Sequence, residues 1–244
     1  KWQTNEGLYA ESLDIGEGKT CTPADQPTKV EDGNLVLSIQ AAEDGKATSN
    51  GKEIKTDYVY SRLTTKEKFD QRFGLFSTSI KLPTSTGAAS NTAFWLCPTG
   101  TWGKTFAASQ RVGKFAGCSV GEIDTIEFSP QWNPVMFQVA THWWDDLTLV
   151  NAGQNAIKVK DDSLLSGEYI NMSTVWTPNS ILTYYNGQLV DAVRNLEAVP
   201  DASMYMLYTL KPAGYYPQKN WVGSFTDEDL KDIVAYVDWC RAYK

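Results

Sequence analysis

The sequence predicts an all-β domain built as a sandwich or barrel. Short runs of alternating apolar and polar residues recur along the chain, and turn residues separate them. Long stretches with helical periodicity are nearly absent. No repeats, low-complexity tracts or linkers interrupt this pattern, so we expect residues 1–244 to form a single domain.

The predicted strands are short and follow one another along the whole chain. They are residues 34–39, 58–63, 73–82, 92–96, 121–128, 136–143, 173–176, 181–185, 188–190 and 233–243. The Asn186-Gly187 pair between two of these runs is a strong signal for a tight hairpin. Thr226 and the three acids after it predict one capped helical turn before the last strand.

Charge and composition exclude several classes of partner. The chain has 244 residues, a net charge of -7 and a pI of about 4.8, so we expect neither nucleic acid nor anionic membranes as partners. No apolar run approaches the roughly 20 residues of a membrane-spanning helix. The start at Lys1-Trp2-Gln3, without Met, fits a processed protein that is secreted, displayed on a bacterial surface or periplasmic.

The cysteines and tryptophans each leave two interpretations open. Four cysteines allow three full pairings; a Cys97–Cys118 disulfide would close the loop before strand 121–128, and buried thiols are the alternative. No Cys-x-x-Cys pair occurs, and one histidine makes a structural zinc site improbable. The 9 Trp and 12 Tyr fit a carbohydrate cleft, because indole faces stack on sugar C–H groups, or else a Trp-rich core.

Segment 121–128 contains the strongest functional signal, the three carboxylates Glu122, Asp124 and Glu127 on one predicted strand. Burying like charges this close together is costly, because they repel and each loses hydration. Glycosidic bond cleavage uses such a group, since it needs two carboxylates beside the anomeric carbon. An exposed strand with solvated acids is the alternative, but the apolar residues between the acids indicate that one face packs into a core.

The parity of this strand predicts a β-bulge. Glu122 and Asp124 share a face, whereas Glu127 would point to the opposite one. A one-residue bulge near Thr125 and Ile126 would bring Glu127 back. The two glutamate backbones would then lie four strand steps, about 13 Å, apart. Side chains that lean inward would bring the carboxyls to roughly 5–6 Å, as in retaining glycosidases.

Several motifs, found in the same order, resemble glycoside hydrolase family 16, whose bulged signature is E-x-D-x-x-E. The matching pieces are Tyr60-Ser61-Arg62-Leu63, Phe73 to Pro83, Ala93-Phe94-Trp95-Leu96, Trp176 to Gly187 and Val237 to Lys244. Together with the acidic strand they span nearly the whole chain. The resemblance implies a curved β-jelly-roll sandwich of two antiparallel sheets with a substrate cleft on its concave face.

The resemblance also implies roles for the acids. Glu122 would be the nucleophile that forms a glycosyl-enzyme, and Glu127 would be the general acid and later the base. Asp124 would tune that protonation and hold Glu122 in place. The chain is thus expected to be a retaining, endo-acting hydrolase of O-glycosyl bonds, whose coupled acids titrate as a group.

Substrate-binding candidates come from the same comparison. His142, the one histidine, lies near a cleft position of the family and would hydrogen-bond the substrate or the acids; a structural histidine is the alternative. Trp95 is interpreted as a stacking platform or a core residue, and Arg62 as a ligand of hydroxyls or part of a surface ion pair. Further candidates in or near the expected cleft loops are Trp132, Trp143, Trp144 and Trp221. Trp176 and Trp239 are expected in the core.

Asp238 is the one candidate metal ligand. It resembles a position that, in the family, helps to bind a structural calcium ion on the convex side. No cofactor is expected for catalysis. The expected partner is a polysaccharide, and the expected state is a monomer.

Two substrate classes and one non-catalytic function remain open. The Ser/Thr-rich stretch 89–92, the stretch 208–214 and the turn at 226–230 depart from the glucanase pattern and favour a red-algal β-galactan of the agarose or porphyran type. An endo-β-1,3- or mixed-linkage glucanase, of the laminarinase or lichenase type, is the alternative. A non-catalytic, lectin-like module is the rival from another class, but it would not need Glu122 and Glu127 at this spacing.

Overall fold

The structure is a computed structural model, and its strands account for most of the described chain. It describes residues 2–4, 13–15, 18–49, 51–85, 90–99, 119–145, 148–159, 164–194, 199–200, 202–212, 230 and 233–244. The strands are β1 (Gln3–Thr4), β2 (Leu13–Asp14), β3 (Thr20–Pro23), β4 (Thr28–Glu31), β5 (Asn34–Ala41), β6 (Lys46–Ser49), β7 (Lys52–Lys55), β8 (Tyr58–Thr64), β9 (Gly74–Lys81), β10 (Ser90–Pro98), β11 (Ser119–Phe128), β12 (Met136–Asp145), β13 (Thr148–Lys158), β14 (Tyr169–Thr177), β15 (Ser180–Tyr185), β16 (Gln188–Val193), β17 (Met204–Pro212) and β18 (Val234–Tyr243).

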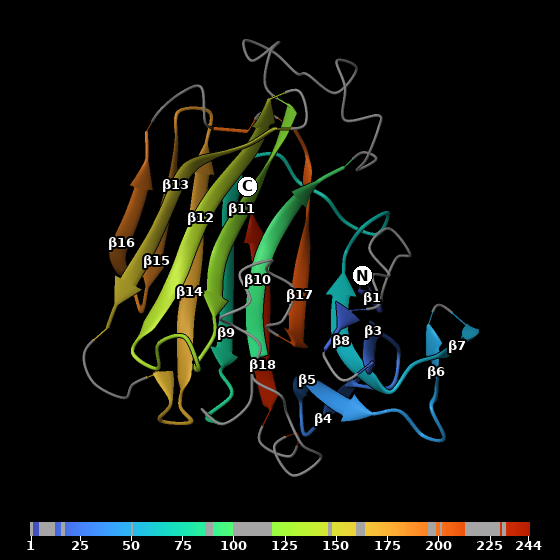
Figure 1. The fold of residues 1–244 in the computed structure, drawn as a ribbon. Coiled ribbons are helices and arrows are strands. Elements are labelled where there is room, and N and C mark those ends of the chain that lie inside the picture. Colours follow the sequence, from blue (N-terminus) through green and yellow to red (C-terminus); the bar gives the residue numbers. More distant parts are fainter. Residues whose placement is uncertain are drawn as a thin grey trace.

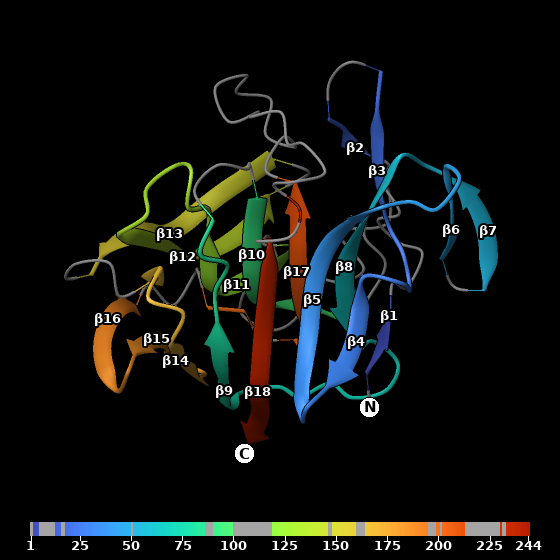
Figure 2. The ribbon, with the colours of Figure 1, turned by 90° about the horizontal axis from the view of Figure 1, so that it is seen from below.

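These strands form two curved layers that face each other (Figures 1 and 2). The hydrogen-bonded order is β13-β12-β11-β10-β17-β8 in one layer and β5-β18-β9-β14-β15-β16 in the other, and neighbours are antiparallel. Pairing of β5 with β8, at Ile39↔Tyr60, joins the layers along one side. The predicted all-β jelly-roll sandwich is confirmed, with the two sheets linked into one hydrogen-bonded path.

The core lies between the layers and is rich in aromatic residues. Phe94 of β10 stacks on Tyr208 of β17 with ring centroids 4.8 Å apart. Trp176 of β14 is fully buried, as predicted, and its Nε1 donates to the carbonyl oxygen of Pro200. Trp239 was also predicted to be a core residue, but it is only partly buried and lies beside the Arg241 guanidinium, 4.6 Å from its ring centroid. The β-bulge between Val237 and Trp239 explains this, because it changes which residues of β18 face outward.

The predicted Asn-Gly hairpin is confirmed between β15 and β16. Asn186 and Gly187 have φ values of 47° and 79°, the left-handed pair that a tight two-residue turn requires. Tyr185 pairs with Gln188 directly across this turn.

Two long strands were absent from the sequence prediction. One is β13, and the other is β17, which lies between β10 and β8 in the middle of its layer. Nearly every residue of β17 is buried, so apolar side chains occur on both of its faces and the alternation that marks a half-buried strand is lost. Its position matters because β17 contributes residues to the site.

Some predictions fall outside the described residues. The capped turn at Thr226 and the Cys118 partner of Cys97 belong to that part of the chain. Among the described residues, Cys21 is buried and Cys240 partly buried; both are thiols, and burial raises the pKa of Cys240 to about 11. No helix in the described ranges is long and apolar enough to cross a membrane.

Candidate active site

Strand β11 carries the three acids and lies between β10 and β12. Its core-facing side chains are fully or almost fully buried; they are Ile123, Thr125, Ile126 and Phe128. Glu122, Asp124 and Glu127 lie on the other side of the layer. We call this side, formed by β8, β17, β10, β11 and β12, the acid face.

Pairing with β12 shows the predicted bulge. Glu122 pairs with His142 and Glu127 with Gln138, so five residue steps on β11 lie against four on β12. Pairing with β10 shifts at the same place, since Asp124 pairs with Trp95 and Ile126 with the adjacent Phe94. The extra residue falls at Thr125 and Ile126, as predicted, and returns Glu127 to the face of Glu122. Four strand steps correspond to about 13 Å between the two glutamate backbones.

The core anchors the bulge. The Thr125 hydroxyl lies 2.8 Å from the Thr174 hydroxyl of β14 in the opposite layer, and both side chains are fully buried. Ile126 packs into the main hydrophobic cluster. Two consecutive residues therefore point into the core, which is what a bulged strand allows and a regular strand does not.

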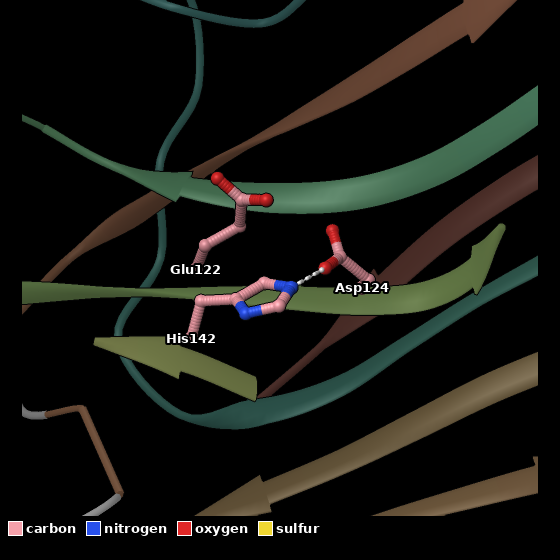
Figure 3. Close-up of side chains that lie close together, drawn as sticks. All are labelled: Glu122, Asp124 and His142. Atoms are coloured by element: carbon pink, nitrogen blue, oxygen red, sulfur yellow. Dashed lines mark ion pairs between the residues drawn. The ribbon is translucent and has the colours of Figure 1, made fainter. Parts of the chain in front are cut away.

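Asp124 of β11 lies in contact with the imidazole of His142 on the neighbouring strand β12. Nε2 of His142 lies 3.1 Å from Oδ2 of Asp124 (Figure 3). Glu122 projects beside them. One oxygen or nitrogen atom of each of the three residues lies within 4.8 Å of the other two. Among the described residues, this is the one cluster of three such side chains that could hold a metal ion. The ion pair, and a hydrogen bond between Glu122 and Asp124, account for this spacing, so we assign the group as an acid–imidazole cluster and not as metal ligands.

Burial dominates the electrostatics of the cluster. It raises the pKa of Glu122 well above the ordinary carboxyl range, and Asp124 adds to the rise while His142 opposes it. Burial also raises the pKa of Asp124, with Glu127 adding to it and the hydrogen bond to Glu122 opposing it. The ionised forms of Glu122 and Asp124 are therefore disfavoured, and the two carboxyls titrate as a unit.

Lys211 of β17 belongs to the same electrostatic group, and the sequence analysis assigned it no role. Burial lowers the pKa of its amine and Arg62 lowers it further, whereas Glu127, Glu122 and Asp124 oppose this, with Glu127 the strongest of the three. The signal in the sequence was the departure of stretch 208–214 from the glucanase pattern. Without a predicted strand there, that departure could not be placed beside the acids.

Trp95 and Arg62 both lie on the acid face. Trp95 is partly buried next to a small cluster of Cys97, Tyr205 and Leu207 that is separate from the main core. Its Nε1 donates to the Thr209 hydroxyl at 3.0 Å, and the Arg62 guanidinium carbon is 5.5 Å from its ring centroid. Arg62 is buried, which excludes the exposed ion pair considered as its alternative.

The other candidates are less closely tied to the acids. Trp132 lies in the turn after β11 and is 38% exposed. Trp143 and Trp144 continue β12 beyond His142, but their side chains, like all of Trp221, lie outside the described part. Asp238 is exposed at the bulge of β18. Among the described residues, it does not belong to a cluster of His, Cys, Asp or Glu side chains that could hold a metal ion.

The arrangement has the parts that acetal chemistry needs. Two carboxyl groups lie on one face four strand steps apart, and a third, between them, contacts an imidazole. One carboxyl can attack or stabilise a carbon centre while the other donates a proton to the departing oxygen.

Comparisons with known proteins agree with this geometry. The model of "Glycosyl hydrolases family 16" matches residues 16–239. Glucan endo-1,3-beta-glucosidase A1 of Niallia circulans is 25% identical over 263 residues, which cover all of this chain and 35% of that protein. The chain therefore spans about a third of the length of this curated relative.

Solved structures share the fold. LamAcat from Zobellia galactanivorans superposes with a TM-score of 0.68 at 20% identity, over 100% of this chain and 90% of that one. The laminarinase catalytic domain from Thermotoga maritima MSB8 gives 0.67 at 19% identity, over 100% and 98% of the two chains.

Proposed function

Because this chain belongs to family 16 of the glycosyl hydrolases, we propose that it is a retaining, endo-acting glycosidase whose substrate is a β-1,3-linked glucan. The observation that carries the proposal is the bulge in β11, which puts Glu122, Asp124 and Glu127 on one face. The substrate class is supported by the names of a glucan endo-1,3-beta-glucosidase and a laminarinase among the similar proteins. These names rank a glucan above the galactan that the sequence departures favoured.

The first chemical step forms a covalent intermediate. The reactive form is the one in which Glu122 is ionised, although burial raises its pKa and makes this form less populated. In it the Glu122 carboxylate attacks the anomeric carbon as the bond from that carbon to the glycosidic oxygen breaks. Glu127 gives its proton to the departing oxygen, so the leaving sugar carries a neutral hydroxyl. Negative charge thereby moves from Glu122 to Glu127 along the same face.

The second step releases the product with its original configuration. The Glu127 carboxylate takes a proton from water, the water oxygen bonds to the anomeric carbon, and the bond to Glu122 breaks. Two inversions at one carbon give net retention. Glu127 ends protonated and ready for the next cycle.

Asp124 and His142 support both steps through contact with Glu122. Asp124 shares a hydrogen bond with Glu122, and its Oδ2 lies 3.1 Å from His142 Nε2. Such contacts fix the rotamer of the nucleophile and disperse its charge. Trp95, which pairs with Asp124, and Arg62, which lies beside the Trp95 ring, are the proposed sugar-binding surface.

A β-galactan is the second candidate substrate. Stretch 208–214, which departs from the glucanase sequence pattern, includes Thr209, whose hydroxyl accepts a hydrogen bond from Nε1 of Trp95. This departure therefore alters the contacts of the residue proposed to stack on the sugar, and with it the shape of the binding surface.

Further properties are proposed with the activity. Because polysaccharides are too large to enter a cell intact, we propose that the protein acts outside the cytoplasm. We also propose a single catalytic domain that works as a monomer, with Asp238 as a candidate ligand of structural calcium and no catalytic cofactor.

The first experiment is product analysis on a polysaccharide panel. It uses laminarin, lichenan, barley β-glucan, agarose, porphyran and κ-carrageenan, with Glu122→Ala as the blank. We expect laminarin oligosaccharides whose new reducing ends first appear as the β-anomer by NMR. Galactan oligosaccharides would move the substrate to the second candidate. Binding without cleavage of any polymer would overturn the enzyme assignment.

The two glutamates can be told apart with azide and an activated aryl β-glycoside. In Glu122→Ala, azide would bond to the anomeric carbon from the vacant nucleophile side, expel the phenolate and give an α-glycosyl azide. In Glu127→Ala, the glycosyl-enzyme still forms, and azide then displaces Glu122 to give the β-azide. The same anomer from both variants would contradict these roles.

A further inference from the structure

Lys211 has no part in the mechanism above, although it is a cation placed among three catalytic carboxyls. Burying an ammonium group is unfavourable unless anions surround it. Here the anions are Glu127, Glu122 and Asp124, and each of them favours the charged form of the amine.

The sheet register explains how Lys211 reaches the acids. Thr209 of β17 pairs with Ala93 of β10, and Ala93 pairs with Glu127 of β11, so these three residues form one row across the sheet. Lys211 is two residues beyond Thr209 and therefore on the same face. Ala93 carries only a methyl group, so it adds little bulk between β17 and Glu127.

Among the described residues, the titratable and charged groups on this face come from four strands, including β17 with Lys211. Strand β11 supplies the three acids, β12 supplies His142 and β8 supplies Arg62. The neighbouring residues of β10, which are Asn91, Ala93 and Trp95, are uncharged. Of the three acids, Glu127 has the strongest electrostatic interaction with Lys211.

We propose that Lys211 is a positioning residue whose ammonium group offsets the charge of the acid cluster and sets the pH range in which the cluster holds the one proton that the mechanism needs. The proposal rests on the proposed function, because it concerns the same two glutamates. A nearby cation stabilises ionised carboxyls, so its removal makes each carboxyl of the cluster hold its proton to higher pH. Both limbs of the pH–rate profile then move in the same direction.

The test compares three variants of the full chain. Lys211→Met removes the charge, and Lys211→Arg keeps it. Lys81→Met is the matched control. Lys81 is also a strand lysine, but it lies beside Tyr236 in the other layer, with Nζ 5.5 Å from that ring centroid. The measurement is kcat/KM on laminarin from pH 4 to pH 9.

For Lys211→Met we expect both limbs to shift upward by roughly 0.5–1 pH unit, about three- to tenfold in proton affinity. Lys211→Arg and Lys81→Met should follow the wild-type profile. A lower profile of unchanged shape would show a merely structural role and overturn the proposal. A rise in KM with unchanged limbs would also overturn it, because it would make Lys211 a substrate ligand.

Thermal unfolding without substrate separates this proposal from the proposed function. Without Lys211 the ionised acids repel more strongly, so Lys211→Met should lower Tm more at pH 7.5 than at pH 4.5. An equal loss at both pH values would overturn the proposal. If wild type cleaved no polymer of the panel, the proposed function would fail while this measurement would still decide the role of Lys211.

Discussion

The two faces of β11 differ in the free energy they contribute to folding. The core face buries Ile123, Thr125, Ile126 and Phe128 against the opposite layer, and its one polar group has a hydrogen-bond partner in Thr174. The acid face crowds three carboxyls into surroundings that raise the pKa of Glu122 and Asp124, which means that their ionised forms are disfavoured. One face of β11 thus stabilises the fold, whereas the other holds reactive groups that lower the free energy of unfolding.

This contrast implies that changes on the two faces have separable effects. Core-face substitutions should lower stability, and activity should fall only with the folded fraction. Substitutions of Glu122 or Glu127 should remove activity and leave stability equal or higher. Four predictions follow that contrast, from the largest effect to the smallest.

The acid face should show the largest effect, and it should appear in activity alone. Glu122→Gln or Glu127→Gln is expected to lower kcat on the glucan by about 10³-fold or more, because each removes a group that acts in the transition state. Glu53→Gln, on the exposed hairpin strand β7, is the control. A loss of folding cooperativity in either acid variant would contradict the separation of the two faces.

Phe128→Ala should show the largest effect on stability. Phe128 is fully buried, and truncation of such a side chain costs about 3–5 kcal/mol of the free energy of unfolding. Urea denaturation measures this cost, and Phe128→Leu should retain most of the stability. Activity measured during heating should disappear together with the folded signal; its loss well below the unfolding midpoint would show that the core face also tunes the chemistry.

The Thr125–Thr174 pair tests whether the bulge is anchored in the core. Thr125→Val leaves the Thr174 hydroxyl buried without its partner and should cost about 1–3 kcal/mol. The double variant Thr125→Val/Thr174→Val should regain much of that loss, because two methyl groups then replace two hydroxyls. A double-mutant cycle from urea unfolding gives the coupling energy; simple additivity would rule out the contact.

The smallest predicted effect is the dependence of stability on pH. Since the folded state raises the pKa of Glu122 and Asp124, it binds their protons more tightly than the unfolded chain. The free energy of unfolding should therefore fall as pH rises from the ordinary carboxyl pKa, about 4, through the raised values. Glu122→Gln should be more stable than wild type at pH 7.5, by about 1 kcal/mol or 2–4 °C in Tm, and should match it near pH 4. Melting curves at both pH values test this, and a constant difference would contradict it.

Local patterns in the sequence were sufficient for much of the fold and for the acids. Alternating runs predicted most strands, and Asn186-Gly187 predicted a hairpin, because these signals depend on the periodicity of one strand or the φ angles of one turn. The bulge at Thr125 and Ile126 was predictable for the same reason. Three acids with mixed parity on one strand can share a face only if one extra residue is inserted.

The tertiary structure decided which distant residues surround those acids. Lys211 and Arg62 belong to strands more than 50 residues from Glu122 in the sequence, and β17, buried on both faces, lacked the alternation that would have identified it. Trp239 was misplaced for a related reason, since a bulge in β18 changes the face it presents. Periodicity within a strand determines what each residue can face, whereas pairing across the sheet determines what it meets there.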